Sequence, residues 1–167
     1  MAVRERVIIE SPYAGATPAD TEDNLFYLRC CMHDALVHRG EAPFASHGLY
    51  TQPGVLDDSI PAERTAGIEA GFLWRPVADR TAVYLDRGIS RGMKYGIEHA
   101  IKLGHPLVYR AFLDPVPGKQ PSFRCEITHW GEQVEIDAPG LPGGMVRAAS
   151  IEEAIKALTT MNLERRR

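Results

Sequence analysis

Residues that could bind a ligand or move a proton follow three short apolar segments of this 167-residue chain. After the first segment they are Glu10, Ser11, Pro12 and Tyr13, after the second Ser46 and His47, and after the third Asp86, Gly88, Ser90 and Gly92. In a parallel α/β sheet, ligands bind beyond the carboxyl ends of the strands, where loops and helix N-termini meet. We therefore expect these residues to surround one binding site.

The group after the third segment is suited to an anion. Gly88 and Gly92 permit close approach of the backbone, and Ser90 supplies a hydroxyl at the start of a helix, where free amides and the helix dipole attract negative charge. A phosphate fits this pattern. The alternative is structural: Ser90 only caps the helix, and the glycines only permit tight packing.

Tyr13 and His47 each have a functional and a structural interpretation. Tyr13 could stack on a base or present its hydroxyl to a sugar, and the alternative is a half-buried structural tyrosine. His47 could contact a ligand or carry a proton, and the alternative is a buried histidine whose hydrogen bonds the fold satisfies. The residue types alone leave these alternatives open.

The elements that must position these residues alternate between strand and helix. Short apolar runs predict strands at residues 6–10, 42–47, 81–85 and 106–109. Three- and four-residue apolar spacing predicts helices from Thr17 or Thr21 to Gly40, from 61 to 74, and from Met93 to Gly104. This alternation implies parallel pairing, so we predict an α/β fold with a Rossmann-like or flavodoxin-like parallel sheet of about four strands flanked by helices.

The last third of the chain has a different pattern. Residues 123–128 and 133–136 alternate around Trp130-Gly131-Glu132, which is typical of a β-hairpin, and residues 145–147 predict a short strand. Ser150 and Glu153 form a capping box for a last helix. We expect one domain over residues 1–167, with residues 1–112 as the ligand-binding core and residues 113–167 as a C-terminal appendage.

Composition narrows the possible partners. Nineteen Lys and Arg against 22 Asp and Glu give a formal net charge of −3, so no global field favours long nucleic acid. No apolar run approaches the ~18 residues of a membrane span, and the first residues lack a signal-peptide pattern, which predicts a cytoplasmic protein without a membrane partner. Cys30, Cys31 and Cys125 fit neither a disulfide framework nor a metal clip. The sequence predicts no metal and no cofactor.

Several short motifs occur in a recognisable order along residues 6–110. They are a strand that runs into Ser11-Pro12-Tyr13, then Ala42-Pro43-Phe44-Ala45-Ser46-His47, Ala78-Asp79 before a strand, and Ser90-x-Gly92 with Ala100 and Gly104-His105-Pro106. In this order they resemble the nucleoside 2-deoxyribosyltransferase superfamily. The chain is more closely similar to small uncharacterised proteins often encoded by bacteriophages.

This resemblance implies a pocket for a small-molecule nucleotide or nucleoside, with Tyr13 near the sugar. It also implies that the turn from Ser90 to Gly92 holds a 5′-phosphate, as in the members that hydrolyse nucleoside monophosphates. In the catalytic members, a glutamate on the helix after this turn is the nucleophile at the anomeric carbon, and an aspartate from the preceding helix assists. Relatives commonly complete one site with a neighbouring subunit, which makes a homo-oligomer possible.

The two carboxylates are where this chain departs from the family pattern. Counting along the motifs places the family glutamate at Gly96 and the family aspartate at Gly71. The nearest acids, Glu98 and Glu69, are each two residues away, which along a helix is a rotation of about 200°. With the family register kept, both acids point away from the pocket.

Different functions follow from this departure. If a two-residue shift restores the helix acids, or if Glu10 or Asp86 substitutes for them, the protein is an N-glycosidase or 2-deoxyribosyltransferase-like enzyme, with Tyr13, Asp86, Ser90 and Glu98 at the site. Otherwise it is a non-catalytic module that senses or sequesters a nucleotide. A third hypothesis is a structural or assembly protein that uses the C-terminal hairpin as an interface.

Overall fold

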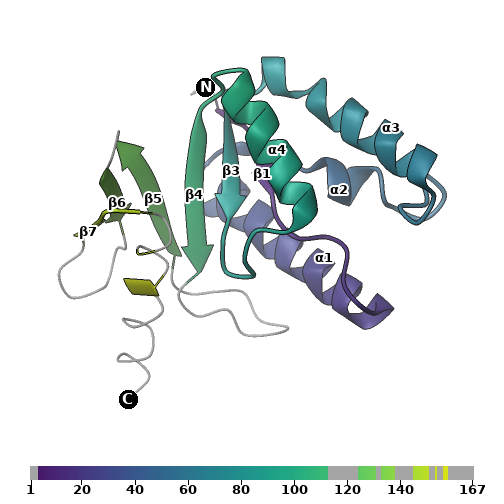
Figure 1. Cartoon of the computed structure of the whole chain (residues 1–167), viewed down its shortest axis with the longest axis horizontal. Coiled ribbons are helices and arrows are strands. Elements are labelled where there is room, and N and C mark those ends of the chain that lie inside the picture. Colours follow the sequence, from purple (N-terminus) through teal and green to yellow (C-terminus); the bar gives the residue numbers. More distant parts are fainter. Residues whose placement is uncertain are drawn as a thin grey trace. The chain divides into compact units, whose positions relative to one another are not determined.

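A computed structural model describes residues 4–112, 124–130, 133–137, 145–150, 153 and 156–157 of the chain (Figure 1). The chain divides into two compact units. The first comprises Met1–Val83 and Ile89–Leu107, and the second comprises Tyr84–Gly88 and Val108–Arg167. Among the described residues, no helix has the length and apolar character needed to cross a membrane.

Three strands form the centre of the first unit. They are β1 (Arg6–Glu10), β2 (Ala42–Phe44) and β3 (Arg80–Tyr84), of which β3 belongs to this unit up to Val83. β1 lies in the middle and pairs in parallel with both neighbours, with Val7 opposite Pro43 on one side and Arg80 on the other. Ile8 and Ile9 are buried. Such a continuous apolar run is typical of a parallel strand covered on both faces.

Four α-helices surround these strands. They are α1 (Pro18–His33), α2 (Ser46–Leu49), α3 (Pro61–Phe72) and α4 (Arg91–Lys102), with a π-helical turn at Asp34–His38 after α1 and a 3₁₀ turn at Arg75–Val77 after α3. α4 lies against β1, where Gly96 meets Glu10 (Figure 1). α4 thereby brings its first two turns to the carboxyl end of β1.

Capping residues define where two of the helices begin. The Thr17 hydroxyl accepts a hydrogen bond from Asp20 N at 3.2 Å, and the Asp20 carboxylate accepts one from Thr17 N at 2.9 Å. This reciprocal capping box selects Thr17 over Thr21 as the start of α1. Ser90 caps α4 by accepting a hydrogen bond from Met93 N at 3.3 Å.

Two element boundaries differ from the sequence prediction. The strand predicted for residues 42–47 ends at Phe44, and residues 46–49 form α2, closed by a hydrogen bond from Tyr50 N to the Ser46 carbonyl at 2.8 Å. The helix predicted to reach Trp74 ends at Phe72. A tighter 3₁₀ turn follows it, because Pro76 lacks the amide that would continue an α-helix.

The second unit contains an antiparallel meander. Its strands are β4 (Leu107–Phe112), β5 (Arg124–Trp130), β6 (Gln133–Asp137) and β7 (Met145–Ala148). β5 and β6 pair in antiparallel register, as do β6 and β7, so the predicted hairpin and the short strand after it are confirmed. Ser150 accepts a hydrogen bond from Glu153 N at 3.1 Å, as the capping pattern predicted. Most of the helix predicted after it lies outside the described residues.

Within the first unit the strands are hydrogen-bonded in the order β2-β1-β3, and the strands of the second unit follow in the order β4-β5-β6-β7. In the first unit β1 lies between β2 and β3, as in a flavodoxin-like sheet, in which the chain-order reversal beside β1 creates a ligand crevice at the carboxyl ends of the strands. The predicted α/β fold class is therefore confirmed.

The capping box of α1 can be tested by substitution. Thr17→Ala should lower the free energy of unfolding by about 1 kcal/mol, because the amide of Asp20 loses its acceptor at the helix N-terminus. Urea denaturation measures this change. Thr65→Ala is the control, since the Thr65 hydroxyl only donates to the Pro61 carbonyl on the exposed side of α3, and it should change stability by less than about 0.5 kcal/mol. Equal effects of the two substitutions would contradict the capping role.

Candidate functional site

A pocket of about 260 Å³ opens at the carboxyl end of β1, and every residue that lines it belongs to the first unit. Seven of the residues singled out from the sequence line it: Glu10, Ser11, Tyr13, Ser46, His47, Ser90 and Gly92. Further lining residues come from the loop before α3, from α3 itself and from the first half of α4. Segments that are distant in the sequence thus form one concave site.

Glu10 and Arg75 form a buried ion pair in this pocket. Arg75 Nη2 donates to Glu10 Oε1 at 3.2 Å, and Arg75 Nη1 donates to the Thr81 hydroxyl at 2.9 Å. The Arg75 side chain is 2% exposed and that of Glu10 is 14% exposed. Burial raises the pKa of the Glu10 carboxyl to about 7, and the neighbouring Arg75 opposes this rise. Glu10 can therefore gain or lose a proton near neutral pH.

Gly96 provides the space that the Glu10 carboxylate fills. A Cβ atom at position 96 would lie 2.8 Å from Glu10 Oε2 and closer still to Oε1. Any larger residue at this position would therefore force the carboxylate to move. The Glu10 carboxylate, which comes from β1, thus occupies the space that a side chain at position 96 of α4 would take.

Gly71 on α3 also leaves space for a side chain from another element. A Cβ atom there would lie 2.8 Å from both Cβ and Oγ of Ser46, the first residue of α2. Beside it, the Ser11 hydroxyl and His47 Nε2 are hydrogen-bonded at 2.9 Å. Burial lowers the pKa of His47 to about 4, so the imidazole is neutral at neutral pH. This part of the pocket therefore carries neutral polar groups.

Tyr13 reaches the pocket from the loop between β1 and α1. Asn24 Nδ2 donates to the Tyr13 carbonyl at 3.0 Å, and Gly15 N donates to the Thr21 hydroxyl at 3.1 Å. Both contacts fasten the loop to α1. The Tyr13 side chain is half-buried and lines the pocket, a position that suits contact with a ligand.

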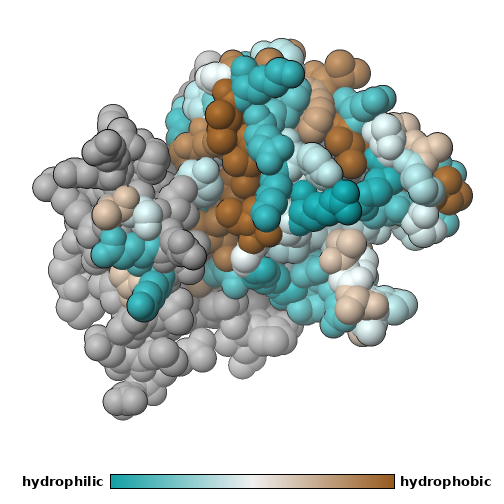
Figure 2. Space-filling model, viewed as in Figure 1, coloured by the Kyte–Doolittle hydropathy of each residue, from teal (hydrophilic) through white to brown (hydrophobic). Residues whose placement is uncertain are grey.

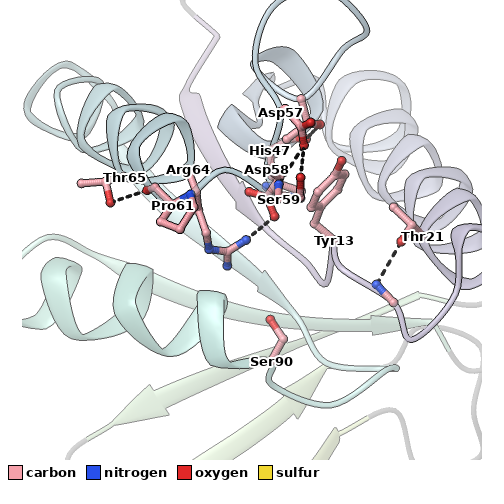
Figure 3. Close-up of polar contacts among 12 residues, drawn as sticks. Tyr13, Thr21, His47, Asp57, Asp58, Ser59, Pro61, Arg64, Thr65 and Ser90 are labelled. Atoms are coloured by element: carbon pink, nitrogen blue, oxygen red, sulfur yellow. Dashed lines mark hydrogen bonds and ion pairs between the residues drawn. The ribbon is translucent and has the colours of Figure 1, made fainter.

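The Arg64 guanidinium approaches the turn at the start of α4. Arg64 Nη2 lies 3.8 Å from the point that a Cβ of Gly92 would occupy, and Arg64 forms an ion pair with Asp58. Figure 3 shows Arg64 reaching from α3 toward the side of the pocket that holds Ser90. Ser90 caps α4, as its structural interpretation predicted, and it also lines the pocket. Phosphate binding at this turn stays a prediction.

Four residues named from the sequence do not line the pocket: Pro12, Asp86, Gly88 and Glu98. Asp86 Oδ1 accepts a hydrogen bond from Phe112 N at 2.6 Å within the second unit. Gly88 has a positive φ of 73°, which only a turn with glycine adopts readily. Glu98 is exposed on α4, in the region where Figure 2 shows a hydrophilic stripe beside an apolar one. The expectation that a register shift returns Glu98 to the pocket is therefore not met.

Glu69 is likewise exposed and does not line the pocket. Sequence reasoning missed Arg75, Arg64 and Asp58, since Arg75 follows a predicted helix and the others lie in a segment where charged residues are usually solvated. In the described part of the chain, no three His, Cys, Asp or Glu side chains gather as metal ligands would.

The raised pKa of Glu10 predicts a pH dependence of stability. The native state binds the Glu10 proton more tightly than the unfolded state does. Protonated Glu10 therefore stabilises the fold fully below about pH 4.5, and this contribution is lost as pH rises through about 7. Relative to Glu10→Gln, the wild type should lose on the order of 3 kcal/mol of unfolding free energy between pH 4.5 and 8. His47 acts in the opposite sense, but it is present in both proteins. Urea titrations at four pH values measure the difference, and parallel curves for the two proteins would contradict it.

The fit between Gly96 and Glu10 predicts a coupling between the two positions. Gly96→Ala should destabilise the protein by about 1–3 kcal/mol, because the added methyl displaces the Glu10 carboxylate from Arg75. In a Glu10→Ala background the same change should be neutral or stabilising, since alanine is the better helix former. Gly92→Ala, whose nearest neighbour would be 3.8 Å away, is the matched control on α4. Additive effects at positions 10 and 96 would show that the carboxylate does not occupy this space.

Comparisons with known proteins place the described site within a family. No curated protein matches the chain. Among solved structures, a 2-deoxyribosyltransferase from the psychrotolerant bacterium Bacillus psychrosaccharolyticus is similar at a TM-score of 0.44 and 16% sequence identity, over 61% of this chain and 69% of that one. A likeness at this level does not carry that enzyme's activity over, and the likeness to bacteriophage-encoded proteins stays a prediction. The family model described as "Domain of unknown function (DUF7768)" matches residues 5–110, which include every residue that lines the pocket. The chain therefore belongs to this family of domains of unknown function.

Proposed function

We propose that this pocket binds a nucleotide or nucleoside and cleaves its N-glycosidic bond, as an N-glycosidase or a 2-deoxyribosyltransferase-like enzyme. The observation that carries the proposal is the Glu10 carboxylate. It is buried, it has a pKa near 7, and it lies in one pocket with Tyr13 and with the turn at the start of α4. A carboxylate, an aromatic side chain and an anion-binding turn match the three parts of a nucleotide that such a reaction must hold.

Each lining group has a defined role in this proposal. Tyr13 lies beside the sugar, where its ring packs on the ribose face or its hydroxyl reaches a sugar oxygen. The turn from Ser90 to Gly92 holds a 5′-phosphate through backbone amides at the N-terminus of α4. Glu10 lies under the anomeric carbon. Ser11 and His47 offer neutral hydrogen-bonding groups to the base.

Glu10 acts in its ionised form. As the bond between C1′ and the base nitrogen breaks, its electron pair leaves with the base, which takes up a proton, and positive charge develops at C1′. The Glu10 carboxylate stabilises this charge or traps it as an ester. Water then adds to C1′, its oxygen becomes the sugar hydroxyl, and the carboxylate is regenerated with release of a proton. In a transferase, a second base takes the place of water.

A second function has its own support. Arg75 neutralises Glu10, and the acids Glu69 and Glu98 on α3 and α4 are exposed. These features suit a module that binds a nucleotide without cleaving it, in order to sense or sequester it. Oligomerisation, a cytoplasmic location and an interface role of the C-terminal hairpin stay predictions.

Base release from a panel of nucleosides and nucleoside 5′-monophosphates, followed by chromatography, tests the catalytic proposal. Glu10→Gln should reduce the rate roughly a thousandfold, because it removes the charge that stabilises the transition state. Glu98→Gln is the matched control on the exposed face of α4, and it should leave the rate within a few-fold of wild type.

Two results would contradict this proposal, the first for the role of Glu10 and the second for catalysis as a whole. If Glu10→Gln keeps its rate while Glu98→Gln loses it, the catalytic carboxylate is on α4 after all. If the wild type binds a panel member and releases no base from any of them, the non-catalytic module is the function.

A further inference from the structure

We infer that Arg64 selects ligands that carry a phosphate, and that Asp58 holds Arg64 until such a ligand displaces it. This inference rests on the proposed function, because it concerns the same pocket. The observation that supports it is the ion pair between Arg64 and Asp58, both of which line the pocket. The expected substrate class is therefore the nucleoside 5′-monophosphate, with the nucleoside discriminated against.

Arg64 lies in the main pocket, close to the turn at the start of α4. Arg64 and Asp58 both line the main pocket, together with Ser90, Arg91 and Gly92. Arg64 Nη2 lies 3.8 Å from the position of a Gly92 Cβ, so the guanidinium faces the turn directly (Figure 3). An anion seated on that turn is within reach of Arg64, whose planar group binds phosphate through two parallel hydrogen bonds.

Asp58 is the fixed member of the pair. It belongs to a loop whose neighbouring residues are tied down: Asp57 Oδ1 accepts hydrogen bonds from Ser59 N and Oγ at 2.9 and 2.6 Å, and Glu63 Oε2 accepts one from Asp57 N at 2.6 Å. Arg64 is a long side chain that is 39% exposed, against 22% for Asp58. A rearrangement would therefore move Arg64 and leave Asp58 in place.

Arg64 also has room to move. A second cavity of about 50 Å³ is lined by Asp58 and Arg64, and also by Ser46, His47 and Ile68, which line the main pocket as well. The ion pair thus stands between two spaces.

The charges of the pocket make this exchange selective. Among its lining residues, Arg75 is paired with Glu10, and Arg91 Nη2 donates to the Tyr95 hydroxyl at 3.3 Å. An uncharged sugar cannot compete with a carboxylate for a guanidinium, whereas a phosphate dianion can. Asp58 therefore acts as an internal competitor that an uncharged nucleoside does not displace.

Calorimetric titration with ribose 5-phosphate, inorganic phosphate and ribose tests this inference without assuming a base. Arg64→Gln should weaken binding of both phosphates by about tenfold or more, because a charge-assisted contact is lost. Asp58→Asn should do the opposite and strengthen binding several-fold, since the competitor is removed. Ribose binding should be unaffected by either change. Arg29→Gln and Glu22→Gln, which break a 3.0 Å surface ion pair, are the matched controls and should leave phosphate binding unchanged.

Opposite signs for the two members of one ion pair separate this role from a structural one. If Asp58→Asn weakens phosphate binding as much as Arg64→Gln does, or if Arg64→Gln has no effect, the inference is wrong. Thermal unfolding checks that each variant is folded, and Arg64→Lys, which keeps the charge, should retain part of the affinity. Opposite signs without base release would support Arg64 and reject the enzyme. Equal base release from nucleosides and monophosphates would do the reverse.

Discussion

The ion pair between Glu10 and Arg75 is the interaction on which the pocket depends. Both side chains are buried, and Arg75 uses one nitrogen for Glu10 and another for Thr81 on β3. Removing one partner from such a pair leaves an uncompensated buried charge, which typically costs about 3–5 kcal/mol. The pKa of Glu10 stays above its usual value even beside Arg75, so the desolvation of the carboxylate is only partly offset. A group held in this state is poised to change its charge when a ligand enters.

This pair explains Gly96 on α4, and Gly71 on α3 makes space for a different side chain. Gly96 leaves the space that the Glu10 carboxylate fills, and Gly71 leaves the space beside Ser46. At Gly96 the backbone of α4 faces the Glu10 side chain at the end of β1, and at Gly71 the backbone of α3 faces the Ser46 side chain at the start of α2. Glu10 is therefore carried by β1, which is paired with a strand on each side, and Ser46 is the first residue of α2.

The same logic extends to the charges of the pocket. Glu10 is matched by Arg75 and Asp58 by Arg64, so each anionic side chain in the lining has a cationic partner. The two pairs differ in burial, and this difference gives them different roles. The buried pair sets the protonation of Glu10, whereas the more exposed pair is weak enough for an anionic ligand to exchange.

The sequence by itself determined the local structure of this protein. β1, the start of α1 at a capping threonine, the cap of α4 by Ser90 and the hairpin of β5 and β6 were all predicted, because apolar spacing, capping residues and turn residues act over a few positions. The rotation of 200° between positions 96 and 98 also follows from helix geometry alone, and it placed Glu98 on the outer side of α4. Only the tertiary structure decided which carboxylate enters the pocket. Glu10 and Asp86 both follow or end a strand, and their roles separate because Asp86 binds Phe112 N while Glu10 meets Gly96 and Arg75. The roles of Arg75 and Arg64 could not be predicted for the same reason. From the sequence alone a long cationic side chain is expected to be solvated, and its partner is determined only when helices and loops pack around the end of β1.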